Sequence, residues 1–219
     1  MKLKRLELGF FKVNCYILSL ASVNIIIDPG ADFDIIHKNL EEDNIKPDFI
    51  LNTHGHYDHI GAVKDMISSY RIPFYIHELE ESIIKDPEKN FSSFFGENEL
   101  SLETYNLIKN TDYSYFADLG VEIINVPGHT PGSIMFKTDN VLFTGDLLFK
   151  GAIGRTDLPG GNMAQMKKSL AKIKKMDRQL IIYPGHGEIS SLECEMESNY
   201  YLGDYFLRED NQKEKGDLL

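Results

Sequence analysis

Three histidines and one aspartate lie within six consecutive residues, at His54, His56, Asp58 and His59. This histidine cluster (54–59) follows an apolar run, 49–51, that is typical of a buried strand. Imidazole nitrogens and carboxylates grouped in this way are ligands that zinc, iron and manganese accept in proteins. A solvated polar turn is the alternative, but three of the chain's seven histidines fall here. The spacing therefore predicts a metal site.

Three further candidate ligands, His129, Asp146 and His186, each follow a short apolar strand and a glycine. Strand ends of this kind can meet the histidine cluster at one edge of a folded domain. Seven ligands are too many for one tetrahedral zinc with an open position. They suit two metal ions that share one carboxylate. Such a pair lowers the pKa of a bound water towards neutrality and polarises a substrate carbonyl, which makes a nucleophile without a serine or a cysteine.

The elements that must position these ligands alternate along the chain. Apolar alternation and β-rich runs predict strands at 3–8, 13–20, 24–27, 48–52, 73–76, 121–126, 133–137, 141–143 and 179–183. Helical spacing predicts helices at 61–70, 77–85 and 192–202. It also predicts a helix that is capped by Asp32 and turns Ile35, Ile36 and Leu40 inward. A further helix is expected to be capped by Asn162 and to turn Met163, Met166, Leu170 and Ile173 inward. A group of strands followed by helices appears twice along the chain. This order predicts an α+β fold, a four-layer αββα sandwich.

The amino-acid composition restricts the kinds of partner that the protein can bind. The net charge of −11 argues against a nucleic-acid groove, and 42% hydrophobic residues suffice for one sizeable core. The N-terminus lacks the apolar stretch of a signal peptide, and no apolar run is long enough to span a bilayer. Cys15 and Cys194 are too few and too far apart for a disulfide framework or a thiolate zinc site. We therefore expect a cytoplasmic protein that acts on a small molecule, with no nucleic-acid or membrane partner.

The segment 86–116 is rich in phenylalanine and tyrosine and has weak periodicity. A segment this long inside a compact domain is usually functional or has structure of its own. It could form a lid or a substrate wall, or pack on the core as an ordinary aromatic cluster. His77 has no ligand-spaced partner beside it, so a surface or helix-capping role is expected.

Four motifs resemble those of the metallo-β-lactamase-fold superfamily. They are Thr-His-Gly-His-Tyr-Asp-His at 53–59, Pro-Gly-His-Thr-Pro-Gly-Ser at 127–133, Thr-Gly-Asp at 144–146 and Pro-Gly-His-Gly at 184–187. The resemblance covers about residues 13–202. Its nearest branch is glyoxalase II (hydroxyacylglutathione hydrolase), in the short bacterial form without the long C-terminal helical domain. The resemblance implies one metallo-β-lactamase-like domain at 1–203, followed by a polar tail at 204–219.

The resemblance also implies a role for each motif residue. His54, His56 and His129 would hold the first divalent metal, and Asp58, His59 and His186 the second. Asp146 would bridge the two ions, with zinc expected first and iron or manganese as alternatives. Asp58 would also orient the metal-bound hydroxide, which makes it the catalytic side chain. Arg155 matches the position of a cationic residue for a glutathione carboxylate, although it can equally pair with Asp157.

The implied reaction is hydrolysis of a thioester such as S-lactoylglutathione. The alternative is a persulfide dioxygenase with one non-haem iron on His54, His129 and Asp146. The Gly-Arg-Thr-Asp loop at 154–157 fits both branches, whereas the intact second ligand set favours hydrolysis. A β-lactamase of the common zinc type would carry cysteine at position 146. A nuclease of this fold would need a basic face.

Overall fold

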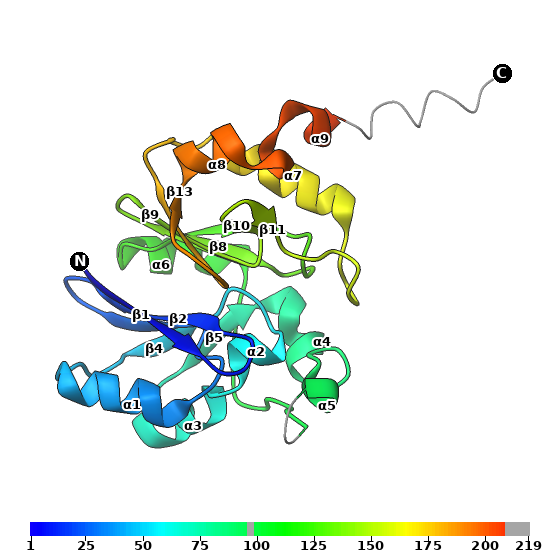
Figure 1. Cartoon of the computed structure of the whole chain (residues 1–219). Helices are drawn as coiled ribbons and strands as arrows, with labels where there is room; N and C mark the ends of the chain where they lie inside the picture. The colour runs from blue at the N-terminus through cyan, green and yellow to red at the C-terminus, as the bar shows by residue number, and fades with distance from the viewer. Residues whose placement is uncertain (96–98, 209–219) are drawn as a thin grey trace.

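The computed structural model describes residues 1–95 and 99–208 (Figure 1). One sheet has the strand order β1-β2-β3-β4-β5-β6, antiparallel from β1 to β3 and parallel from β3 to β6. Its strands are β1 (Lys2–Leu8), β2 (Val13–Ser19), β3 (Asn24–Ile27), β4 (Phe49–Leu51), β5 (Phe74–His77) and β6 (Asn106–Ile108).

The second sheet has the order β13-β12-β9-β8-β7, in which only β12 and β9 run parallel. Its strands are β7 (Glu122–Asn125), β8 (Ile134–Thr138), β9 (Val141–Gly145), β12 (Ile181–Pro184) and β13 (Ser190–Ser191). A two-stranded ribbon, β10 (Leu148–Phe149) with β11 (Ala152–Ile153), lies between β9 and β12 in the chain.

Helices cover the outer face of each sheet (Figure 1). The first sheet carries α1 (Phe33–Glu42) and α3 (Val63–Tyr70), and the second carries α7 (Met163–Ile173) and α8 (Leu192–Ser198). The remaining short helices are α2 (Tyr57–Ile60), η1 (Glu78–Glu80), α4 (Glu81–Ile84), α5 (Ser92–Phe95), η2 (Asn110–Asp112), α6 (Tyr113–Asp118), η3 (Tyr200–Leu202) and α9 (Asp204–Arg208). No helix in the described ranges combines the length and the apolar composition needed to cross a bilayer.

Three apolar cores separate the four layers. Successive side chains of a strand point to opposite faces, and β2 uses both faces. Cys15 and Ile17 join the core beneath α1 and α3, whereas Tyr16 and Leu18 join the core between the sheets. The third core lies between the second sheet and its helices. The predicted αββα sandwich is therefore confirmed.

Two helix faces differ in detail from the prediction. Ile36 and Leu40 of α1 are buried, but Ile35 is 46% exposed, and Met163 of α7 is 39% exposed. Asp32 occupies the N-cap position of α1, as expected, but its backbone is left-handed and its carboxylate makes no capping hydrogen bond; it accepts one from the amide of Gly9 instead. Asn162 does cap α7, by accepting from the amide of Gln165.

His77 and the start of the predicted tail are also packed. His77 is buried, so the surface role is wrong; it caps η1 by accepting a hydrogen bond from the amide of Leu79. The first residues of the predicted tail form α9, whose Phe206 packs into the core of the second sheet. The rest of the tail, 209–219, lies outside the described residues.

Candidate metal centre

The seven candidate ligands all lie shortly after strands, at one edge of the sandwich, on loops or, for Asp58 and His59, in the short helix α2. The cluster 54–59 follows β4, His129 follows β7, and Asp146 and His186 follow β9 and β12. Because β9 and β12 are parallel neighbours with Pro184 opposite Gly145, Asp146 and His186 emerge side by side. Gly185 makes this approach possible, since a Cβ there would lie 2.2 Å from Oδ1 of Asp146.

Backbone contacts join the two sheets at this edge. The amide of Ile134, at the start of β8, donates to the carbonyl of Thr53 at 3.0 Å. The side chains of Asn14 and Tyr16 on β2 both donate to the carbonyl of Pro184, at 3.0 and 2.6 Å. The ligand loops of both sheets are thus fixed to each other independently of any ion.

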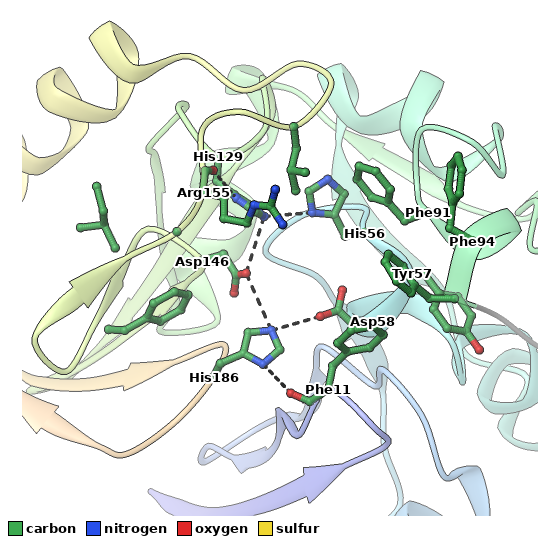
Figure 2. A pocket seen from close by; sticks show the side chains of 15 residues that line it. Phe11, His56, Tyr57, Asp58, Phe91, Phe94, His129, Asp146, Arg155 and His186 are labelled. Atoms are coloured by element: carbon green, nitrogen blue, oxygen red, sulfur yellow. Dashed lines mark hydrogen bonds and ion pairs between the residues drawn. The ribbon is translucent and has the colours of Figure 1, made fainter.

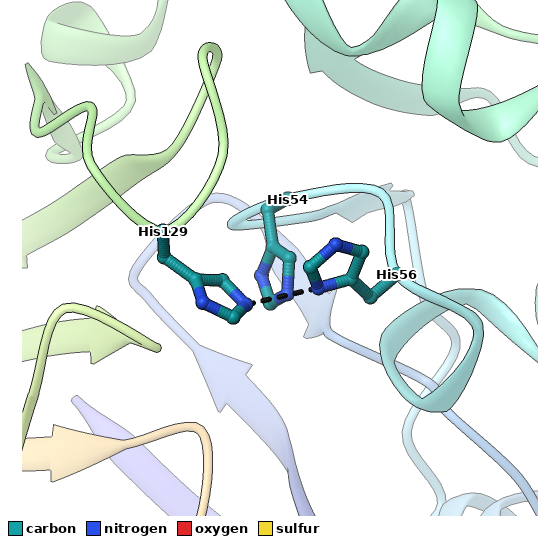
Figure 3. Close-up of side chains that lie close together, drawn as sticks. All are labelled: His54, His56 and His129. Atoms are coloured by element: carbon teal, nitrogen blue, oxygen red, sulfur yellow. Dashed lines mark hydrogen bonds between the residues drawn. The ribbon is translucent and has the colours of Figure 1, made fainter. Parts of the chain in front are cut away.

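His54, His56 and His129 form the first group, and their rings converge (Figure 3). Nε2 of His129 lies 2.9 Å from Nδ1 of His56, and the ring centroids of His54 lie 4.8 Å from those of both partners. All three side chains are buried.

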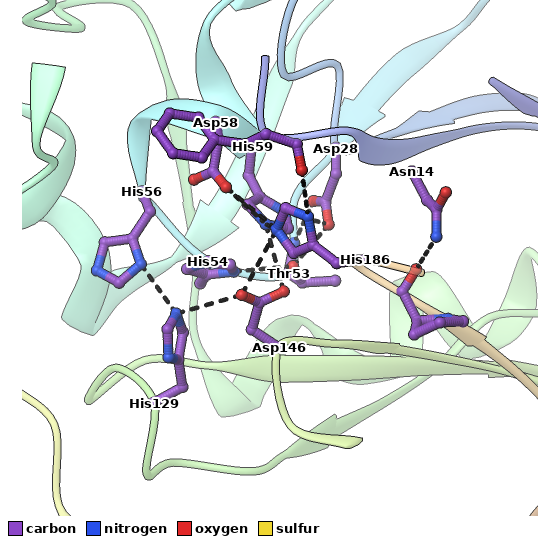
Figure 4. A network of polar contacts seen from close by, with 12 residues as sticks. Asn14, Asp28, Thr53, His54, His56, Asp58, His59, His129, Asp146 and His186 are labelled. Carbon is purple, nitrogen blue, oxygen red and sulfur yellow. Dashed lines mark hydrogen bonds and ion pairs between the residues drawn. The ribbon is translucent and has the colours of Figure 1, made fainter. Parts of the chain in front are cut away.

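Asp58, His59 and His186 form the second group (Figure 4). Nε2 of His186 lies 3.1 Å from Oδ2 of Asp58 and 3.3 Å from Nε2 of His59. Asp146 stands between the two groups. Its carboxylate oxygens lie 3.6 Å from Nε2 of His129, 3.3 Å from Nε2 of His59 and 3.8 Å from Nε2 of His186.

These distances fit cation ligands. Two atoms bound about 2.0–2.1 Å from one tetrahedral ion lie roughly 3.3 Å apart, close to the separations within both groups. Within the described chain, the buried side-chain atoms without a hydrogen-bond partner include Nε2 of His54 and Oδ1 of Asp146, besides Nε2 of His56 and the Oδ1 atoms of Asn14 and Asn52. Unpaired buried polar atoms are costly, and an ion between the groups would satisfy those of His54 and Asp146.

In three candidate histidines, the ring nitrogen Nδ1 already makes a hydrogen bond. His59 donates from Nδ1 to Asp28 at 2.9 Å, His129 to the carbonyl of Arg155 at 2.8 Å, and His186 to the carbonyl of Phe11 at 3.0 Å. Such bonds fix the tautomer and leave Nε2 free for a metal. The hydrogen bonds made by these Nδ1 nitrogens are therefore those expected around a metal site.

The electrostatics hold His54 and Asp146 in metal-binding protonation states. Burial, with the neighbouring rings of His59 and His129, lowers the pKa of His54 well below its usual value. Burial raises the pKa of Asp146, but His59 outweighs it and leaves that pKa well below the usual carboxyl value. A neutral imidazole and an ionised carboxylate are the forms that bind cations. For His59, burial lowers the pKa, but the carboxylates of Asp146 and Asp58 outweigh it and raise that pKa well above its usual value.

Two buried acids that support the ligand loops were not predicted. Asp28 accepts from the amide and hydroxyl of Thr53 as well as from His59. Asp28 directly follows the buried strand β3, and a position shortly after a strand is the sequence signal that could have identified it. Glu80 accepts from the amides of Gly55 and Gly132, on two different ligand loops. No local pattern distinguishes it from its neighbour Glu78.

A pocket of about 720 Å³ opens over both groups (Figure 2). Asp58, Asp146 and His186 line it, whereas His54 and His59 lie behind them with exposures of 1% and 0%. Arg155 lies at the pocket, but its guanidinium makes a two-point pair with Asp157, at 3.0 and 2.9 Å. The structure therefore shows the alternative contact for Arg155, and its substrate role stays a prediction.

Comparison with known proteins identifies the family. Residues 8–186 match the metallo-beta-lactamase superfamily, and the chain belongs to this superfamily. The probable metallo-hydrolase YqgX of Bacillus subtilis is 31% identical, over 94% of this chain and 100% of that protein. The hydroxyacylglutathione hydrolase GloC of Haemophilus influenzae is 30% identical, over 92% and 98%. The crystal structure of the BLEG-1 B3 metallo-beta-lactamase superposes with a TM-score of 0.85 and 33% identity, covering 92% of this chain and 99% of that one.

The family and fold expected from the motifs are thus confirmed. The relatives and the ligand clusters together define a metal-dependent hydrolase of this superfamily. The substrates named for the relatives belong to those proteins.

Proposed function

We propose that the protein hydrolyses a thioester, of the S-lactoylglutathione kind, with two divalent metal ions. The observation that carries the proposal is the position of Asp146, whose carboxylate reaches both histidine groups. His54, His56 and His129 would hold one ion, and Asp58, His59 and His186 the other. When bound, such ions activate a water and polarise the substrate carbonyl. The similarity to GloC supports the thioester as the substrate class.

The chain's own residues supply orientation. Asp58 lines the pocket with 23% of its side chain exposed, so its carboxylate can accept a proton from a water in the pocket. His54 and His59 form the closed floor. Phe11 and Arg155 also line the pocket, which leaves room between them and the ligands for the body of the substrate.

Metal content is the first test. We expect about two metal ions per chain by elemental analysis of the active protein, because the seven candidate ligands form three overlapping triads, which is more than one ion can use. The same preparation should be assayed for S-lactoylglutathione hydrolysis, β-lactam hydrolysis and oxygen uptake with glutathione persulfide. One iron per chain with oxygen uptake and no hydrolysis would favour the dioxygenase instead.

Arg155 offers a second test. In Arg155→Ala we expect KM for S-lactoylglutathione to rise several-fold with little change in kcat, because the exposed guanidinium lines the pocket and pairs with Asp157, not with a candidate ligand. Asp157→Asn is the matched variant. It removes the carboxylate that competes for the guanidinium and should lower KM, but only modestly, since exposed pairs are weak. An unchanged KM in both variants would assign the pair a purely structural role.

A further inference from the structure

Five phenylalanines line the pocket, and they come from distant parts of the chain. Phe11 lies between β1 and β2, Phe149 is in β10, and Phe91, Phe94 and Phe95 belong to the 86–116 segment. We call these five residues the phenylalanine wall. Phe116 of the same segment packs between the sheets, so the segment contributes both to the wall and to the core.

Ring contacts connect the wall to the candidate ligands. Phe91 meets the ring of His56 with centroids 5.2 Å apart, and Phe149 meets His186 at 6.1 Å, both edge to face. Phe11 and Phe95 contact each other at 5.2 Å across the two segments. Figure 2 shows Phe91 beside His56, with Phe94 on the far side of Phe91, and Phe11 beside Asp58. An apolar group on the wall would therefore adjoin the reacting centre.

Core packing does not account for the wall. Phe94 is 67% exposed and Phe95 is 62% exposed, although apolar side chains of this size are usually buried. Exposed apolar side chains gathered at a concave site mark a ligand surface. In the described part of the lining, Arg155 is the one charged side chain besides the candidate ligands, and Asp157 already pairs with it.

The pocket is also large enough to hold an aromatic group beside the candidate ligands. Its volume of about 720 Å³ lies within the range of sites for drug-sized ligands, roughly 300–1,000 Å³. We infer that the natural substrate presents an aromatic-sized apolar group to the phenylalanine wall, next to the bond that is cleaved. The reaction assigned to that bond rests on the proposed function, whereas the binding preference does not.

The preference can be measured without turnover. Phenylacetate and acetate share the carboxylate that a hydrolase product would present to the metals, and they differ by one phenyl ring. By calorimetric titration of the zinc-loaded protein, we expect phenylacetate to bind at least about tenfold more tightly. Phe94→Ser should reduce this ratio several-fold. Ile35→Ser is the matched control, because Ile35 is a similarly exposed apolar side chain on the distant helix α1.

The outcomes separate this inference from the proposed function. Equal affinities for the two acids, or a ratio that Phe94→Ser leaves unchanged, would overturn the apolar-substrate inference even if S-lactoylglutathione is hydrolysed. A clear phenylacetate preference without hydrolysis of lactoyl and phenylacetyl thioesters would support the inference and reject the proposed reaction. If the apolar-substrate inference and the proposed reaction are both supported, kcat/KM should be higher for the phenylacetyl thioester than for the acetyl thioester of the same thiol.

Discussion

Asp58→Ala is expected to lower kcat for S-lactoylglutathione by about 10²–10⁴-fold, the usual contribution of a positioned acid or base. The carboxylate lines the pocket and lies 3.1 Å from Nε2 of His186 and 3.9 Å from Nε2 of His59. Its removal takes away both a proton acceptor and one member of the second ligand group. Single-turnover kinetics on metal-quantified protein would measure the loss.

Two comparisons give this result its meaning. Asp34→Ala removes an exposed carboxylate from α1 and should leave kcat unchanged. Metal analysis of Asp58→Ala should show about one ion lost per chain, while the first group keeps all its histidines. If the variant hydrolyses at the wild-type rate, the second group has no part in the reaction. A hydrolase that needs only the first ligand group would then explain the protein better.

The gathering of the candidate ligands could be predicted because each one lies in a short motif. An apolar strand, a glycine or turn, and then a histidine or aspartate is a local pattern, and strand ends in a sandwich meet at an edge. His129 and Asp146 could be placed together on this basis. The sandwich was predictable for the same reason, since the alternation of β2 and the helical spacing of α7 are local.

The supporting contacts could not be predicted, because they join residues far apart in sequence. Asp28 and His59 are separated by 31 positions, and Glu80 and Gly132 by 52. The capping hydrogen bond expected of Asp32 is absent for a related reason: its carboxylate bonds instead to Gly9, on the turn after β1. Long-range partners of polar side chains depend on the completed fold, and local propensity does not encode them.

Glu80 connects the two loops that supply the first ligand group. It is fully buried, with Oε2 2.8 Å from the amide of Gly55 and Oε1 2.7 Å from the amide of Gly132. Gly55 lies between His54 and His56, and Gly132 lies three residues after His129. A Cβ at Gly132 would come within 2.7 Å of Oε1, so the loop can reach the carboxylate only with glycine there. Burial raises the pKa of Glu80 to about 7, although the hydrogen bonds it accepts oppose this.

Glu80→Gln should lower the free energy of unfolding by about 1–3 kcal/mol, because the amide nitrogen would face one of the two backbone N–H donors. It should also weaken zinc binding by the first group about 10–100-fold, the usual cost of losing a support outside the ligands. Denaturant unfolding of the metal-free protein and chelator competition would measure the two effects separately. The d–d spectrum of the cobalt-loaded protein would report any change in ligand geometry.

Glu195→Gln provides the matched control. Glu195 is equally buried and accepts hydrogen bonds from the amide of Gly151, from Ser190 and from Asn199, none of which belongs to a ligand loop. Both variants should lose stability, because each places a donor against a donor in the interior. Only Glu80→Gln should lose metal affinity and change the cobalt spectrum. If its metal affinity and spectrum instead match those of Glu195→Gln, then Glu80 stabilises the fold without positioning the histidines.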